Sequence, residues 1–227
     1  WDPEKDFILP YHFSIKDLSG KLLNKKFLVK QLDFSIDESI PLIGIVSRLV
    51  SQKGLDLIDE VLDDLMLLDA QWLILGSGEH KYEEMFKNIS TRYPNKIYFY
   101  RGYNNELSHL IEAACDIFLM PSKYEPCGLN QIYSLRYGTV PVVRKTGGLA
   151  DTVYDYDESI ALGLNAGTGY TFKNYTGLAL LHTIERAIRG FHSKEVWREI
   201  QMNGMSKDFS WRVSAEKYIE IYKQALL

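Results

Sequence analysis

"LIGIVSRLVSQKGLDLIDEVLDDLMLLDAQWLILG", residues 42–76, is the stretch that decides the fold. Residues 42–47 and 70–76 are apolar runs of strand length, whereas apolar residues recur at helical spacing between 53 and 68. Strands that are almost continuously apolar and separated by helices are typical of a parallel sheet covered on both faces. The stretch therefore predicts a strand, a helix and a second strand of one parallel sheet.

The same alternation continues to residue 144 and sets the fold class. The expected elements, in order, are helix 79–93, strand 96–102, helix 105–116, strand 117–122, helix 129–138 and strand 140–144. We predict an α/β protein with a Rossmann-like, doubly wound parallel sheet. Three further helical segments follow, at 175–191, 193–209 and 210–227.

One face of the last helical segment is apolar and needs a partner. Its apolar residues recur at helical spacing and are Val213, Tyr218, Ile221, Tyr222 and Ala225. The ordinary partner for such a face is the protein's own sheet, so packing on that sheet is the first expectation.

The composition argues against several classes of function. The 26 Lys and Arg residues against 30 Asp and Glu make nucleic acid an unexpected ligand. The two cysteines, Cys115 and Cys127, form no disulfide framework or zinc motif and fit a reducing compartment. Every apolar run is far shorter than the roughly 20 residues of a membrane span, so no membrane partner is expected.

Ligands of such sheets bind beyond the carboxyl ends of the strands, so the loops there hold the candidate site residues. In loop 47–54, Arg48 and Lys53 could converge on a diphosphate, although cations at this spacing also occur as solvated surface residues. Loop 75–80, LGSGEH, has only two glycines of the dinucleotide fingerprint, so it is interpreted as a tight strand-to-helix turn.

The third loop opens the segment SKYEPCGLNQIYSLRYG at 122–138. Glu125 is expected at the mouth of the crevice, where it would bind sugar hydroxyls; a capping or surface acid is the alternative. The backbone amides of the following helix start would face an anion, and they belong to Gly128, Leu129 and Asn130. Cys127 is interpreted as a small packed residue because no His lies near it in sequence. Together these features outline a nucleotide-sugar site.

Four segments stand in the order found in one enzyme family: SRLVSQKGLDLI (47–58), EPCGLNQIYSLRYGTVPVVR (125–144), TGGLADTV (146–153) and GTGYTF (167–172). With them the chain resembles the bacterial glycogen synthases and plant starch synthases, which are ADP-glucose-dependent retaining glucosyltransferases of the GT-B fold. The resemblance covers essentially all 227 residues but only one half of such an enzyme. It identifies the chain as similar to the C-terminal, donor-binding half.

The resemblance implies a role for each matching residue. Arg48 and Lys53 match the pair that neutralises the leaving ADP diphosphate, so neither a metal nor another cofactor is expected. Glu125 matches the acid that contacts the donor glucose. The helix start at Gly128, Leu129 and Asn130 matches the amides that hold the diphosphate. The other donor-binding positions are Cys127, the adenine-facing Tyr103, the loop residues Ser77 and Gly78, and the glycine pair Gly147 and Gly148.

The chain departs from the family pattern at two positions. Asn130 stands where many members have Thr; because either residue presents a backbone amide, donor binding is expected to survive. Tyr133 stands eight residues after Glu125, where related retaining enzymes have a second Glu. The pattern therefore supplies no second carboxylate for the ribose.

The segment RKTGGLADTV (144–153) presents another candidate cation, Lys145. The family carries two similar segments, one that opens its first domain with a functional lysine and a look-alike late in its second domain. Because RKTGGLADTV follows EPCGLNQ and a late strand, it matches the look-alike. Lys145 is therefore not expected to be the catalytic cation, whereas Gly147 and Gly148 are expected to make a close backbone approach beside the donor sugar.

The resemblance predicts three parts of the chain. Residues 1–40 would be a lead-in segment with a helix, and 41–209 the nucleotide-sugar donor-binding domain. Residues 210–227 would form a helix that crosses to the family's first domain, which this chain lacks.

The parent enzyme would transfer glucose from ADP-glucose to the non-reducing end of an α-1,4-glucan with retention, in a bacterial cytoplasm or a plant plastid. The glucan would bind mainly through the first domain, so this half alone is expected to bind donor weakly and transfer little. The alternatives are a retaining glycosyltransferase that uses a UDP or GDP sugar, and a catalytically silent module that binds nucleotide or glucan.

Overall fold

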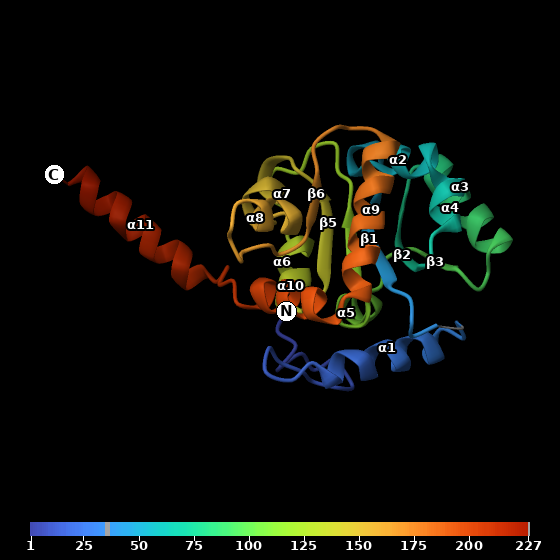
Figure 1. Cartoon of the computed structure of the whole chain (residues 1–227), viewed down its shortest axis with the longest axis horizontal. Helices are drawn as coiled ribbons and strands as arrows, with labels where there is room; N and C mark the ends of the chain where they lie inside the picture. Colours follow the sequence, from blue (N-terminus) through green and yellow to red (C-terminus); the bar gives the residue numbers. More distant parts are fainter. Residues whose placement is uncertain (35–36, 227) are drawn as a thin grey trace.

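Within residues 1–34 and 37–226, which the computed structural model describes, six parallel strands form one sheet (Figure 1). The strand order is β3-β2-β1-β4-β5-β6. The strands are β1 (Leu42–Leu49), β2 (Gln71–Gly78), β3 (Ile97–Arg101), β4 (Ile117–Met120), β5 (Val140–Arg144) and β6 (Tyr170–Phe172). The predicted Rossmann-like, doubly wound sheet is confirmed.

Helices cover both faces of the sheet, because successive strand residues point to opposite faces and both sets are apolar. In β4, Ile117 and Leu119 belong to one hydrophobic core, whereas Phe118 and Met120 belong to the other. The first core is covered by α2 (Leu55–Glu60), α3 (Leu62–Leu67), α4 (His80–Arg92), α9 (Gly177–His192) and α10 (Lys194–Met205). The second is covered by α1 (Ser19–Gln31), α5 (Asn105–Ala114), the adjoining α6 (Asn130–Arg136) and α7 (Gly147–Thr152).

The prediction of a single helix over 53–68 is wrong. The chain forms a short 3-10 turn, η1 (Ser51–Lys53), followed by α2 and α3, which are separated at Val61 with φ −125° and ψ 22°. At this break the carboxylate of Glu60 accepts a hydrogen bond of 2.7 Å from the backbone N–H of Gly177, where α9 begins. Because the contact comes from a distant segment, the helical spacing of 53–68 carries no sign of it.

Two strand predictions also differ from the structure. β6 is absent from the predicted elements, since a strand of three residues gives no periodic pattern. The strand expected at 117–122 ends at Met120, because Pro121 has no N–H to donate to a neighbouring strand. The helix expected within residues 1–40 is present as α1, and residues 35–36 lie outside the described part.

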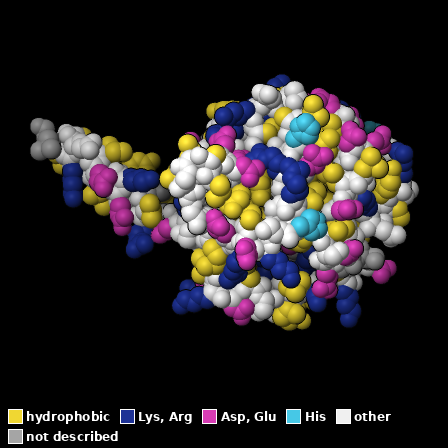
Figure 2. Space-filling model, viewed as in Figure 1, with side chains coloured by type: hydrophobic (Ala, Val, Ile, Leu, Met, Phe, Trp, Pro, Cys, Tyr) yellow, Lys and Arg dark blue, Asp and Glu magenta, His cyan; other side chains and the backbone are white. Residues whose placement is uncertain are grey.

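The last helix, α11 (Trp211–Ala225), projects from the body of the protein and has no buried residue (Figures 1 and 2). On its apolar face Tyr218, Ile221 and Tyr222 are each more than half exposed. The expectation that this face packs on the protein's own sheet is therefore wrong. On the sheet, α9 already covers β5 and β6, and α10 covers β5. Its crossing to the family's first domain stays a prediction, and residue 227 lies outside the described part.

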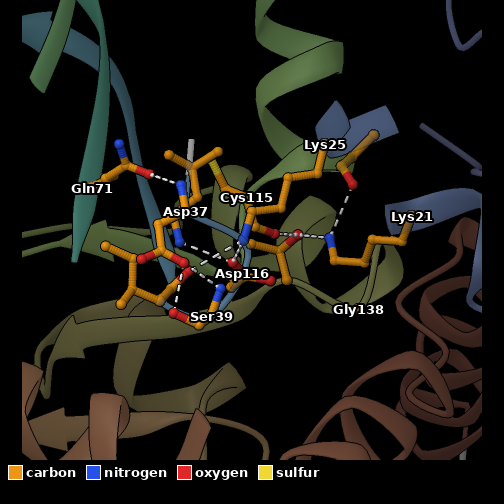
Figure 3. Close-up of polar contacts among 12 residues, drawn as sticks. Lys21, Lys25, Asp37, Ser39, Gln71, Cys115, Asp116 and Gly138 are labelled. Carbon is orange, nitrogen blue, oxygen red and sulfur yellow. Dashed lines mark hydrogen bonds and ion pairs between the residues drawn. The ribbon is translucent and has the colours of Figure 1, made fainter. Parts of the chain in front are cut away.

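An ion pair fastens α1 to the edge of the sheet at which the strands begin (Figure 3). Lys25 Nζ lies 2.7 Å from Asp116 Oδ2, just before β4. The same carboxylate oxygen accepts a hydrogen bond of 2.8 Å from the backbone N–H of Leu42, the first residue of β1. Asp116 therefore joins α1, β1 and β4.

A second lysine of α1, Lys21, caps the end of α5 (Figure 3). Its Nζ donates to three buried oxygens, the carbonyls of Glu112 and Ala113 and the hydroxyl of Thr139. Burial lowers the pKa of Lys21 to about 8, so the ammonium group stays charged at neutral pH and complements the carboxyl end of the helix. α1 is thus attached by charge as well as by its apolar residues.

We expect Lys25→Met to lower the free energy of unfolding by about 2–4 kcal/mol, because it leaves the Asp116 carboxylate without its cation. Lys26→Met is the matched control, since Lys26 pairs with Glu38 at 3.1 Å where both side chains are about half exposed. It should change stability by less than about 0.5 kcal/mol. Urea denaturation measures both; equal losses in the two variants would contradict a structural role for the Lys25–Asp116 pair.

Candidate functional site

A crevice lies beyond the carboxyl ends of β1 and β4, where the strand order reverses. The chain leaves β1 toward β2 and leaves β4 toward β5, so the two connections turn away from each other. Two adjoining pockets occupy the crevice and share Val46, Ser47, Arg48 and Asn130. We call the one that contains Lys53 the cation pocket, and the one that contains Tyr103 and Tyr133 the tyrosine pocket.

The structure brings most of the predicted site residues to these pockets. The cation pocket is lined by Arg48, Lys53, Glu125, Gly128, Leu129 and Asn130. The tyrosine pocket is lined by Ser77 and Tyr103, together with Arg48 and Asn130. The predicted residues that line neither pocket are Gly78, Cys127, Gly147 and Gly148. Ser77 and Gly78 end strand β2 and do not form the expected loop.

Arg48 offers an unpaired cation at the junction of the two pockets. It is the next-to-last residue of β1 and is exposed. Its guanidinium group makes no hydrogen bond or ion pair with any residue that the structure describes. All five of its N–H donors therefore remain available to a ligand.

Lys53 and Glu125 form an ion pair inside the cation pocket. Lys53 Nζ lies 2.6 Å from Glu125 Oε2, and Ser122 Oγ donates to the same oxygen at 3.2 Å. Gly54 permits this approach, because it has φ +72° and a Cβ there would lie 2.0 Å from the carbonyl oxygen of Pro121. The Glu125 side chain is only 10% exposed, so its carboxylate stands in the pocket wall. The expectation that it stands at the mouth of the crevice is wrong.

Side-chain amides fix the start of α6 in the crevice. Asn130 Nδ2 donates to the carbonyl oxygen of Val46 in β1 at 2.9 Å. Gln131 Nε2 donates to the carbonyl oxygens of Cys127 and Gly128 at 2.9 and 3.0 Å. Within the described residues no side chain caps this end of α6, so its first amides stay available to a ligand. Asn130 thus contributes its side chain as well as a backbone amide.

The glycine pair at the start of α7 supports the loop that carries Glu125. Gly148 N donates to the carbonyl oxygen of Glu125 at 2.9 Å, and a Cβ on Gly148 would lie 2.1 Å from the carbonyl oxygen of Cys127. Gly147 has φ +47°, and a Cβ there would lie 2.1 Å from the carbonyl oxygen of Glu125. The close approach expected of these glycines is therefore made to the protein's own loop.

Lys145 lies outside both pockets. Its Nζ forms an ion pair of 2.8 Å with Oε2 of Glu158 in α8 (Tyr156–Ala161). The hydrogen bond from Lys145 holds the pKa of Glu158 below its usual value. That Lys145 is not the catalytic cation stays a prediction.

Glu112 of α5 is a pocket residue that the sequence analysis misses. It lines the tyrosine pocket but is only 2% exposed, and its Oε2 lies 2.8 Å from Ser134 Oγ in α6. Burial raises the pKa of Glu112 to about 8, which favours the neutral carboxyl group at pH 7. The sequence offers one indication of this residue, an acid within the apolar run LIEAA. An acid at an exposed helix position gives the same pattern, so the indication does not identify a pocket residue.

Metal clusters and membrane spans are both absent from the described residues. No group of three or more His, Cys, Asp or Glu side chains there is arranged to hold a metal ion. No helix in residues 1–34 and 37–226 is long and apolar enough to cross a membrane.

Residues 30–201 match the family described as "Glycosyl transferases group 1". The chain is 45% identical over 226 residues to the glycogen synthase of Koribacter versatilis, a match that covers 99% of the chain and 46% of that protein. It is 43% identical over 226 residues to the glycogen synthase of Clostridium perfringens, with 100% and 46% covered. The chain thus spans about half the length of the curated relatives it matches.

Among solved structures, the chain is similar to the catalytic domain of starch synthase IV from Arabidopsis thaliana, bound to ADP and acarbose. The TM-score is 0.90 at 37% sequence identity, and the match covers 99% of this chain and 46% of that one. A glycosyltransferase from Rickettsia africae matches with a TM-score of 0.69 at 21% identity, which shows the shared fold.

We expect Glu125→Gln to raise the affinity for inorganic pyrophosphate roughly threefold to tenfold, because it removes a negative charge beside Lys53. Glu158→Gln is the matched control, since it breaks the similar Lys145–Glu158 pair outside the pockets. It should leave pyrophosphate affinity unchanged. Calorimetric titration of both variants checks the prediction. Equal effects in the two variants would contradict a diphosphate site in the cation pocket, whereas weaker binding by Glu125→Gln alone would show that positioning of Lys53 by Glu125 outweighs the repulsion by its charge.

Proposed function

The chain belongs to the group 1 glycosyl transferases, and from this premise we propose that it is the donor-binding domain of a glycogen or starch synthase. One observation carries the proposal: an unpaired Arg48 and a paired Lys53 lie in one pocket beyond the carboxyl ends of β1 and β4, beside the uncapped start of α6. Two cations and free helix amides are suited to a diphosphate.

ADP-glucose is the donor that we assign to this site. Its diphosphate would lie between Arg48 and Lys53, its glucose near Glu125, and its adenosine in the tyrosine pocket. Support comes from the arrangement of the two pockets, which adjoin and share Arg48. Further support comes from the similar starch synthase IV structure, which is bound to ADP. Tyr103 is 85% exposed at the tyrosine pocket, so its ring is accessible for stacking on the adenine.

Transfer breaks the bond between glucose C1 and the β-phosphate oxygen, which leaves with ADP. It forms a bond from C1 to an acceptor hydroxyl oxygen, and the hydroxyl proton is released together with ADP. In our proposal the acceptor is the non-reducing end of an α-1,4-glucan, and the configuration at C1 is retained. Negative charge grows on the departing ADP, and Arg48 and Lys53 stabilise that charge where it develops. Glu125 orients the glucose by accepting hydrogen bonds from its hydroxyl groups.

The Lys53–Glu125 pair would contact both the diphosphate and the glucose of the donor. An ammonium group has three N–H donors, so Lys53 can keep its 2.6 Å contact with Glu125 and still donate to a phosphate oxygen. The carboxylate in turn keeps a free oxygen for the sugar. This arrangement holds the cation in place before the donor arrives, which lowers the cost of ordering its side chain on binding.

The acceptor and the remaining catalytic groups would come from a first domain outside this chain. We therefore infer that the chain alone binds donor weakly and transfers little glucose, since transfer also requires the acceptor hydroxyl to be held against C1. We place the protein in a bacterial cytoplasm, or in a plastid if its source is a plant.

Arg48→Ala and Lys53→Ala should each weaken ADP-glucose binding about tenfold or more, because each removes a charge-assisted contact to the diphosphate. Lys145→Ala removes a cation outside the pockets and should change affinity less than about twofold. Isothermal titration calorimetry measures all three. A large loss confined to Lys145→Ala would place the diphosphate elsewhere.

The choice of donor is tested by comparing ADP-glucose, UDP-glucose and GDP-mannose in a thermal-shift assay. Stabilisation by ADP-glucose alone supports the assignment, whereas stabilisation only by a UDP or GDP sugar overturns it. Joining residues 1–227 to the first domain of a related glycogen synthase then tests the reaction. Glucan extension from ADP-glucose is expected, and donor binding without any turnover would indicate a silent module.

A further inference from the structure

Among the described residues that line the tyrosine pocket, Glu112 is the only acid. Asn105, Ser108 and Glu112 lie on successive turns of α5, and all three line the pocket, so one face of the helix forms its wall. The Oε1 atom of Glu112 accepts no hydrogen bond from the described residues. It is also not one of the fully buried side-chain atoms that lack a partner in the described residues. This oxygen therefore keeps some accessible surface although the residue is 2% exposed, and the cavity that Glu112 lines is the tyrosine pocket.

The contacts of Ser134 indicate where the proton of Glu112 lies. Ser134 Oγ is 2.8 Å from Glu112 Oε2 and 2.8 Å from the carbonyl oxygen of Asn130. A hydroxyl group has one hydrogen, so it cannot donate to both oxygens. If Glu112 carries a proton on Oε2, the carboxyl group donates to Ser134 and Ser134 donates to Asn130, which satisfies both contacts.

The surroundings of the Glu112 side chain also favour a protonated carboxyl group. Burial raises the pKa of Glu112 to about 8, although the nearby Lys21 ammonium acts in the opposite direction. A neutral carboxyl group leaves Oε1 as a carbonyl-like acceptor that faces the pocket. It also adds no negative charge near Arg48, whereas an ionised carboxylate would repel a bound diphosphate.

We propose that Glu112 is a neutral acid that recognises the nucleoside of the donor, its Oε1 accepting a hydrogen bond from a nucleoside hydroxyl or amino group. The inference rests on the proposed function, because a nucleotide must occupy the tyrosine pocket. A ribose and an adenine both carry such donors, and Tyr133 stands where related retaining enzymes have a second Glu. Glu112 would supply the missing acceptor from a different helix.

Calorimetric titration with ADP and three analogues tests this contact. The analogues are 2′-deoxy-ADP, 3′-deoxy-ADP and inosine diphosphate, which lack the 2′-hydroxyl, the 3′-hydroxyl and the adenine amino group. The unsubstituted chain should bind one of them roughly fivefold more weakly than ADP, and that analogue identifies the group that Glu112 contacts.

Glu112→Met should weaken ADP binding by the same factor and abolish the discrimination against that analogue. Glu112→Gln keeps both a carbonyl acceptor and a donor to Ser134, so it should retain affinity and discrimination. Glu106→Gln, which removes an exposed acid from the same helix, is the control for charge. Equal loss for ADP and all analogues in Glu112→Met would show a structural role and overturn the inference.

A pH series supplies a second test that does not depend on the stability of Glu112→Met. The titratable groups around Glu112 are Lys21 from α1, Tyr133 of α6, Tyr137 after it, and Cys115 after α5. Glu112→Gln retains all four. Because the charge of Glu112 raises the pKa of Lys21, the difference between the two chains reports the coupled titration of Glu112 and Lys21.

Between pH 7 and pH 9 the unsubstituted chain should lose about fivefold in ADP affinity relative to Glu112→Gln, as Glu112 ionises. Parallel pH profiles would overturn the inference. If the unsubstituted chain binds pyrophosphate but neither ADP nor its analogues, the proposed nucleotide function fails and the inference fails with it. Binding of ADP without discrimination among the analogues defeats only the role of Glu112.

Discussion

The reversal of strand order between β1 and β4 is the constraint on which the site depends. Because the connections after these two strands run in opposite directions, neither crosses the carboxyl ends of the strands, and a crevice remains there. The same geometry brings Lys53, which follows β1, against Glu125, which follows β4. Two residues that are far apart in the sequence therefore meet at 2.6 Å because the two strands are neighbours in the sheet.

Close backbone contacts give the loop around Glu125 its fixed shape. Gly54 and Gly148 each allow main-chain segments to approach to a distance that a side chain would forbid. Gln131 ties the loop to α6, and Asn130 ties α6 to β1. The cations and the carboxylate of the cation pocket thus stand on a support that needs little rearrangement to receive a ligand, which favours binding by limiting the entropy lost.

The sequence predicts the parallel sheet because strands buried on both faces leave long apolar runs. It also predicts Arg48, Lys53 and Glu125 as candidate site residues, since ligands bind beyond the carboxyl ends of parallel strands. It does not predict features that depend on contacts between distant segments. The break at Val61, the Lys53–Glu125 pair and the pocket position of Glu112 are of this kind, because each depends on neighbours that local patterns do not contain.

A crystal structure of the chain with bound ADP is the decisive measurement for the crevice. We expect a diphosphate in the cation pocket, with phosphate oxygens in hydrogen-bond distance of the Arg48 guanidinium and of Lys53 Nζ, and with the adenosine in the tyrosine pocket. A diphosphate bound outside the crevice, with Arg48 still unpaired, would contradict this expectation.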